Sequence, residues 1–220
     1  MLLRCPRPPH FGAHLALNSL IFRMAARSLE IGGCETDVVR PLRDVLNRTL
    51  ALGAAVAVAC GAPSDELFDW LTEIELLDEL SAKERMLLTE KASEQLVIDF
   101  SWQSERLVVL LWALNKVPEL PFPTPGGSVA FIEELLPPYG DEPTAQFCVS
   151  AQLRSEDELF SAAHQLQELH AVARQRRISN TEYRPGVPEL DPEVVQERHH
   201  AINWLVGYSG QQWDEVTTDT

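Results

Sequence analysis

Residues 101–115 read SWQSERLVVLLWALN, and apolar side chains occupy nearly every side of the helix that this segment predicts. A helix that is apolar all round lies buried among other elements, whereas a surface helix has a single apolar face. We therefore expect residues 101–115 to form the central helix of the protein, with neighbours on all sides.

The rest of the chain also has helical apolar spacing, and no run shows the alternation and β-branched content typical of strands. Hydrophobic residues make up 45% and charged residues 23% of the 220 residues, which is the composition of a globular protein and argues against disorder. The predicted fold class is all-α: an irregular multi-helix bundle around a central apolar helix, with a long proline-rich connector.

The proline-rich connector divides the chain. Residues 117–143 contain seven of the fifteen prolines and three glycines, a composition that cannot continue a helix. At most a helical turn is expected there, near residues 128–136. We predict four segments that share one core: a loose N-terminal segment 1–14, an N-terminal helical half 15–116, the connector 117–150 and a C-terminal helical half with an acidic tail 151–220.

Local signals predict where individual helices begin and end. Ser81 with Glu84, and Ser155 with Glu158, have the spacing of capping boxes. Asp191 followed by Pro192 is typical of an N-cap and the first helical position. Glycines and a proline indicate the ends of two further predicted helices, at 15–29 and 41–60, and Ser64 is the predicted N-cap of a third, at 65–80.

The net charge of −15 opposes binding to nucleic acid, whose affinity for proteins depends on Lys and Arg contacts with phosphate. Residues 61–100 hold eleven acidic residues against Lys83, Arg85 and Lys91, a local net charge of −8. Such a segment is either a solvated surface or a field that attracts a basic protein.

Cysteine usage and the apolar runs predict a cytoplasmic protein that does not cross a membrane. The four cysteines are far apart and form no C-x-x-C pair, which favours a reducing compartment: Cys5, Cys34, Cys60 and Cys148. Prolines interrupt the N-terminal apolar residues, so no signal peptide is predicted. The longest apolar run, residues 50–60, is about half the length of a membrane-spanning helix.

Arg198 lies within the apolar arc of the last predicted helix, among Val194, Ala201, Ile202 and Leu205. A buried guanidinium costs several kcal/mol unless an anion faces it. We predict a structural ion pair between Arg198 and Glu105, the acidic residue of the central helix, with Asp214 or Asp219 as the alternative partner. An interior pair that fixes helix register is favoured over a catalytic one.

Glu197 and His200 form half of the Glu-x-x-His arrangement of carboxylate-bridged metal sites, but no second copy is present. His164, Glu168 and His170 have helical spacing and equally lack partners. A surface pair is therefore favoured over a metal site, and neither a metal nor a cofactor is predicted.

Trp204 and Trp213 lie near an acidic C-terminal tail, where large aromatic residues require a cover. The tail could turn at Gly207 and Gly210 and fold Trp213 back onto the bundle. Alternatively, a partner protein could cover this region, which would make Trp204, Trp213, Asp214 and Glu215 the partner-binding residues. Ser209 lacks the strand and the G-x-S-x-G frame of an activated nucleophile.

Two blocks, WQSERLVVLLWALNKVPELPFP and ERHHAINWLVGYSGQQWDEVTTDT, resemble the bacterial domain-of-unknown-function 4272 family over about residues 40–220. The resemblance rests on a Trp-x-x-Glu before a Leu-Leu-Trp-Ala-Leu helix and on a terminal Arg, Ala-x-Asn-Trp-Leu and Trp-Asp pattern: Trp102, Glu105, Trp112, Arg198, Asn203, Trp204, Trp213 and Asp214. It implies no catalytic residue, ligand or cofactor.

Three functional hypotheses follow. The first is a non-enzymatic acidic protein that binds a basic protein, as an immunity protein or inhibitor would. The second is a hydrolase with a cleft between the central and final helices, in which the catalytic residues would be Glu105, His200, Asn203 and Asp214. The third is a structural subunit that dimerises through an apolar face. The sequence leaves the oligomeric state open.

Overall fold

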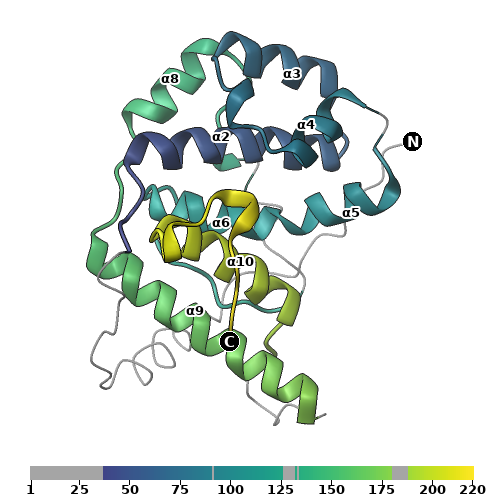
Figure 1. The fold of residues 1–220 in the computed structure, drawn as a ribbon. Helices are drawn as coiled ribbons and strands as arrows, with labels where there is room; N and C mark the ends of the chain where they lie inside the picture. Colours follow the sequence, from purple (N-terminus) through teal and green to yellow (C-terminus); the bar gives the residue numbers. More distant parts are fainter. Residues whose placement is uncertain (1–36, 91, 126–131, 133, 180–187) are drawn as a thin grey trace.

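The computed structural model describes residues 37–90, 92–125, 132, 134–179 and 188–220, and these residues form helices with no β-strand among them (Figure 1). The all-α prediction is therefore confirmed. The predictions for residues 1–14 and 15–29, and most of the helical turn near 128–136, lie outside the described residues.

Helix α2, Leu42–Ala59, crosses the upper layer of the molecule and packs on α3, α4, α5 and α6 (Figure 1). Its bounds lie within one residue of the predicted ones, because Pro41 precedes it and Gly61, with φ 99°, follows its last turn. Most of its residues from Val45 to Val56 are buried.

The acidic region is divided into shorter helices than the sequence predicts: α3 Ser64–Glu73, η1 Leu77–Glu79, α4 Ala82–Thr89 and α5 Glu94–Trp102. The predicted helix over 65–80 is wrong, because Glu75 adopts φ 57° and the amide of Leu76 donates back to Leu71 at 2.9 Å, which ends α3. Pro63, rather than the predicted Ser64, occupies the N-cap position of α3. The capping box of Ser81 and Glu84 is confirmed.

The central helix α6 covers Ser104–Ala113, so it begins three residues later than predicted. Gln103 joins it to α5, and Trp102 belongs to α5, where 40% of its surface is exposed. Every residue from Leu107 to Leu114 is buried. The central position of this helix is therefore observed, although Trp102 is not part of it.

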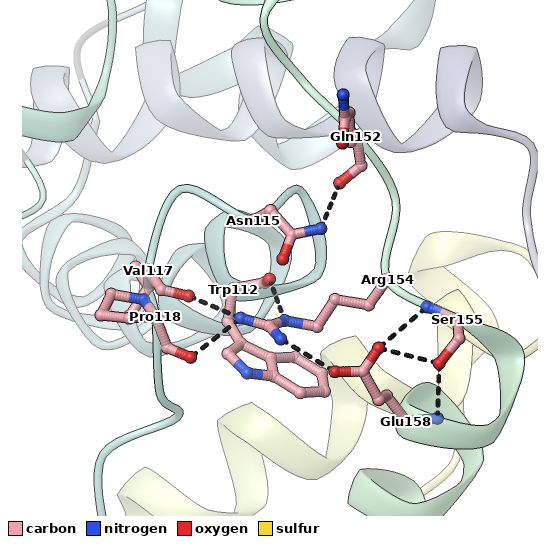
Figure 2. Close-up of polar contacts among 8 residues, drawn as sticks. All are labelled: Trp112, Asn115, Val117, Pro118, Gln152, Arg154, Ser155 and Glu158. Carbon is pink, nitrogen blue, oxygen red and sulfur yellow. Dashed lines mark hydrogen bonds and ion pairs between the residues drawn. The ribbon is translucent and has the colours of Figure 1, made fainter.

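Arg154 joins the end of α6 to the start of α9, Glu156–Ser179 (Figure 2). Its guanidinium donates to the carbonyls of Trp112, Val117 and Pro118 at 2.8–2.9 Å. It also pairs with Glu158 at 3.0 Å and lies 4.8 Å from the centre of the Trp112 ring. The bond to Trp112 satisfies a carbonyl in the last turn of α6, and the bonds to Val117 and Pro118 fix the start of the connector.

The same junction contains the second predicted capping box. The Ser155 amide donates to Glu158 at 3.1 Å and the Glu158 amide to the Ser155 hydroxyl at 3.4 Å. Hydrogen bonds from Ser155 and Arg154 lower the pKa of the Glu158 carboxyl. Asn115, with φ 57°, ends α6 and donates from its side chain to the Gln152 carbonyl at 2.9 Å (Figure 2).

The connector contains a helix that its proline-rich sequence does not predict, α8, Asp141–Val149. Pro143 does not prevent it, because a proline in the first turn removes no intrahelical hydrogen bond. Trp70 of α3 donates to Thr144 at 3.3 Å and meets the Tyr139 ring edge-on at 5.1 Å between centroids. These contacts hold α8 beside α3 (Figure 1).

The last helix, α10, Pro192–Leu205, packs on both α9 and α6 (Figure 1). Its predicted start is confirmed, because the Asp191 carboxylate accepts from the amides of Glu193 and Val194. The tail then forms two short 3-10 helices, η2 Tyr208–Gly210 and η3 Trp213–Glu215, and returns over α10. Buried residues from both halves form one hydrophobic cluster. In the described part of the chain, no helix is both long and apolar enough to span a membrane.

Candidate functional site

The centre of the molecule contains a buried ion pair between α6 and α10. Nη2 and Nε of Arg198 lie 2.7 Å and 2.9 Å from Oε2 of Glu105, and each side chain is 1% exposed. Arg198 also donates to the carbonyl of Pro121 in the connector. The pair that the helical wheel predicts is thus present, and it ties three segments together.

A second buried ion pair, which was not predicted from the sequence, joins α2 to α4. Nη2 of Arg48 lies 2.5 Å from Oε1 of Glu84, with side chains 4% and 1% exposed. Arg48 also donates to the Glu79 carbonyl at 2.8 Å, and Glu84 accepts from the Ser81 amide at 2.8 Å. The sequence carries the same signal of burial for both arginines. Arg48 lies one helical turn from Val45, as Arg198 lies one turn from Val194.

A third pair joins Arg106 of α6 to Glu197 of α10, with both side chains about one-sixth exposed at 16% and 17%. Glu197 is therefore the partner of an arginine and not half of a metal site with His200. Two ion pairs therefore join α6 to α10: Glu105 with Arg198 in the core, and Arg106 with Glu197 near the surface.

Trp213 is held between the second and third pairs. The Arg48 and Arg106 guanidinium carbons lie 5.0 Å and 5.6 Å from the centre of its ring. His200 and Trp204 meet the ring edge-on, with centroids 5.1 Å and 5.3 Å away. Cation–π contacts and edge-to-face ring contacts are both favourable. Together they hold Trp213, and with it the tail, against α2, α6 and α10.

This arrangement corrects the expectation that both tryptophans could serve as a partner-binding surface. Trp204 is 6% exposed and Trp213 7%, because the tail turns at Gly207 and Gly210 and covers them itself. Asp214 and Glu215 remain exposed beside them. The tail, and not a partner, therefore covers the aromatic residues.

The four residues of the hydrolase hypothesis do not share one cleft. Glu105 is engaged with Arg198 in the core, and Asn203 donates to the Thr217 carbonyl at 2.9 Å. His200 is buried against Trp213, whereas Asp214 is exposed. A depression elsewhere contains none of the four; it is lined by Leu50, Gly53, Ala54, Trp70, Leu136, Pro137 and Tyr139.

Among the described residues, no group of three or more His, Cys, Asp or Glu side chains is placed to hold a metal ion. His164 and Glu168 are exposed on α9. His170 instead meets His199 of α10, with a distance of 3.0 Å between their Nδ1 atoms.

A family model described as Domain of unknown function (DUF4272) matches residues 15–216. The chain belongs to this family. The resemblance inferred from the two sequence blocks is thereby confirmed, and the match extends further towards the N-terminus than those blocks do. No curated protein and no solved structure matches the chain.

Burial lowers the pKa of three histidines in this DUF4272 chain, His170, His199 and His200. Burial, followed by the charge of Arg106, lowers the pKa of His200 from 6.5 to about 3, although a backbone hydrogen bond at Trp213 opposes the shift. Burial and His170 lower the pKa of His199 to about 4, and burial also lowers that of His170. Nε2 of His200 has no hydrogen-bond partner among the described residues, which suits a neutral ring.

These shifts predict that the DUF4272 fold loses stability in acid. The unfolded chain takes up a proton at His200 near its ordinary pKa of 6.5, whereas the folded ring stays neutral until the pH approaches about 3. Above pH 6.5 the free energy of unfolding is not reduced by protonation of His200. As the pH falls from 6.5 towards about 3, the free energy of unfolding decreases by about 1.4 kcal/mol per pH unit. Urea unfolding at about pH 7 and about pH 4.5 measures the loss.

The matched variants are His200→Gln and, on the surface of α9, His164→Gln. Between the two pH values, His200→Gln should lose distinctly less stability than the wild type. His164→Gln should lose as much stability as the wild type. A His200→Gln variant with an unchanged pH dependence would show that this ring does not titrate as described.

Proposed function

We propose that this protein is a non-enzymatic binding protein of the cytoplasm whose partner is a basic protein, as an immunity protein or inhibitor would be. One observation supports it above the others: the acidic residues of the α3 to α5 region point outward. Ten of them are exposed: Asp65, Glu66, Asp69, Glu73, Glu75, Asp78, Glu79, Glu90, Glu94 and Asp99.

Few positive charges offset this surface, which we call the acidic face. Of the described basic residues in the same region, Lys83 and Arg85 are exposed, and Arg85 is held by the Leu77 carbonyl at 2.6 Å. Only Glu84 among the acids is buried, where it neutralises Arg48. The ten exposed carboxylates therefore outnumber the two exposed cations described in this region, which leaves a net negative surface.

Such a surface favours a partner of opposite charge. It raises the rate of encounter with a positively charged protein by about ten-fold or more at low salt, and it disfavours nucleic acid and anionic membranes. The dependence on salt follows from the screening length of about 10 Å at 0.1 M. The spacing of the cysteines supports the cytoplasmic part of the proposal.

The hydrolase alternative has less support, because it requires Glu105 to be available beside His200 and Asp214. Glu105 pairs with Arg198 in the core, where each side chain is 1% exposed, and Asp214 lies at the surface. Oε2 of Glu105 accepts from both Nε and Nη2 of Arg198, so this carboxylate is held in the core pair and does not face a cleft.

Affinity capture from the native host at about 20 mM and about 300 mM salt tests the proposal. The wild-type protein should retain one basic protein, identified by mass spectrometry, at low salt and release it at high salt. The variant Glu66→Gln/Asp69→Asn/Glu73→Gln removes three charges from one side of α3 and should retain about three- to ten-fold less of it.

The control variant removes three exposed charges from α9 instead: Glu156→Gln/Asp157→Asn/Glu168→Gln. Its net charge equals that of the α3 variant, so retention at the wild-type level would place the effect on the acidic face. Recovery of no basic protein by the wild type at low salt, or equal losses in both variants, would contradict the proposal.

A further inference from the structure

Helix α5 presents an apolar pair to solvent within the acidic face. Ile98 is 49% exposed and Trp102 is 40% exposed, and their spacing of four residues places them on the same side of the helix. The opposite side is already used, since Phe100 is 1% exposed and α5 packs on α2 and α6. A large part of the Ile98 and Trp102 side chains therefore remains uncovered by the core on which α5 packs.

Trp102 differs from the other tryptophans. The other four are between 5% and 7% exposed: Trp70, Trp112, Trp204 and Trp213. Single exposed aliphatic residues are common on protein surfaces, but tryptophan is enriched at the energetic centres of interfaces. An exposed tryptophan beside an exposed isoleucine has the composition of an interface anchor.

Two acidic residues of α5 lie next to this anchor. Glu94 lies one turn before Ile98, and Asp99 lies beside it; both are exposed. Asp99 accepts from Gln95 at 2.8 Å, and α5 itself contains no Lys or Arg. The exposed side of α5 is thus an apolar centre with a negatively charged rim, the general anatomy of a protein interface.

We propose that this side of α5, defined by Glu94, Ile98, Asp99 and Trp102, is the docking site for a basic amphipathic helix of another protein. Leucine-like side chains of that helix would cover Ile98 and Trp102, and its Lys or Arg residues would pair with the two carboxylates. The inference rests on the proposed function and specifies where and how the basic partner binds.

The charge of the rim selects this occupant. In a symmetric pair of copies, the same patch would face itself and bring Glu94 and Asp99 of both copies together, which is repulsive. A lipid surface, whose net charge is zero or negative, offers no net positive charge to the rim. A helix of two to three turns matches α5, which is nine residues long.

A synthetic 18-residue peptide of leucine and lysine, with leucine at helical spacing, is the probe. Trp102 is the accessible indole, so binding should shift its emission to the blue and protect it from acrylamide. A peptide with the same composition in scrambled order, and a leucine–glutamate peptide with the original spacing, should bind at least ten-fold more weakly.

Ile98→Asn should weaken binding of the leucine–lysine peptide about ten-fold. The matched control Val172→Asn, at a 44% exposed position on α9, should bind within two-fold of the wild type. Both positions are exposed, and equal thermal melting of the two variants verifies that each is folded.

Each contrary result has a distinct meaning. If the leucine–lysine and scrambled peptides bind equally, or Ile98→Asn has no effect, the α5 site is overturned while the acidic face remains a binding surface. If no basic peptide binds at low salt, the α5 site is overturned, whereas the proposed function fails only if affinity capture at low salt also recovers no basic protein. Sedimentation as a dimer with Trp102 already protected would show that a second copy occupies the site, which also overturns the proposal.

Discussion

Replacing Glu105 with alanine lowers the free energy of unfolding by about 3–5 kcal/mol, because the substitution leaves a buried guanidinium without its anion. Arg198 is 1% exposed, and both of its contacts with Glu105 use the same carboxylate oxygen. The Pro121 carbonyl remains as an acceptor but carries no full charge. Urea unfolding followed by circular dichroism measures the loss.

Two further variants establish the cause. Glu168→Ala makes the same substitution at an exposed position of α9 and should change stability by less than about 0.5 kcal/mol. The double variant Glu105→Met/Arg198→Met removes both charges and should be more stable than Glu105→Ala, since no buried charge is left without a partner. A loss below about 0.5 kcal/mol for Glu105→Ala would mean that the pair contributes nothing to the core.

The second large effect is expected at Gly207, where alanine should cost about 3 kcal/mol or more. Gly207 has φ 72°, and a Cβ atom there would come within 3.0 Å of the backbone N and C atoms of Val38 and closer still to its carbonyl oxygen. Left-handed backbone costs an alanine about 1–2 kcal/mol, and overpacking adds about 1–3 kcal/mol.

The collision with Val38 has a further effect, because residues 37–40 cap the C-terminal end of α10 by hydrogen bonding. The Arg40 amide donates to the Leu205 carbonyl at 2.9 Å, and Arg40 Nη2 donates to the Gln211 carbonyl at 2.6 Å. A side chain at position 207 would push this segment away and release both bonds. Loss of the terminal cap should therefore accompany the steric cost.

Gly210→Ala is the matched control for Gly207→Ala. Gly210 has φ 67° but no atom within 4 Å of a Cβ built there, so its substitution should cost only the backbone strain of about 1–2 kcal/mol. The difference between the two free energies isolates the collision with Val38. Equal losses for the two variants would show that residues 37–40 do not pack on Gly207 in solution.

The local features of the fold could be predicted from sequence to a large extent. The capping boxes at Ser81 and Ser155 and the cap at Asp191 were found because they depend on side chains within three residues of each other. The breaks at Glu75 and Gln103 were missed, since neither residue is a usual helix terminator. Helix α8 was missed because the prolines around it outweighed its short apolar pattern.

The candidate surface shows the same division. The sequence identified the acidic segment, but it assigned Trp102 to the buried central helix, and only the break at Gln103 turns this residue outward. Conversely, Trp204 and Trp213 were considered as partner-binding residues, and the return of the tail buried them. In each case a turn of the backbone makes the exposure of a tryptophan the opposite of what its sequence position predicts.

The sequence by itself determined the helical class, the central apolar segment and the burial of Arg198, because each depends on the spacing of apolar residues along one helix. It also indicated Glu105 as the partner, since the central helix offers no other acid. Only the tertiary structure decided that Arg48 pairs with Glu84, that Arg106 pairs with Glu197 and that both arginines enclose Trp213. A helical wheel gives the direction of a side chain, but its partner depends on how helices distant in sequence cross, and that crossing is set by the packing of the whole core.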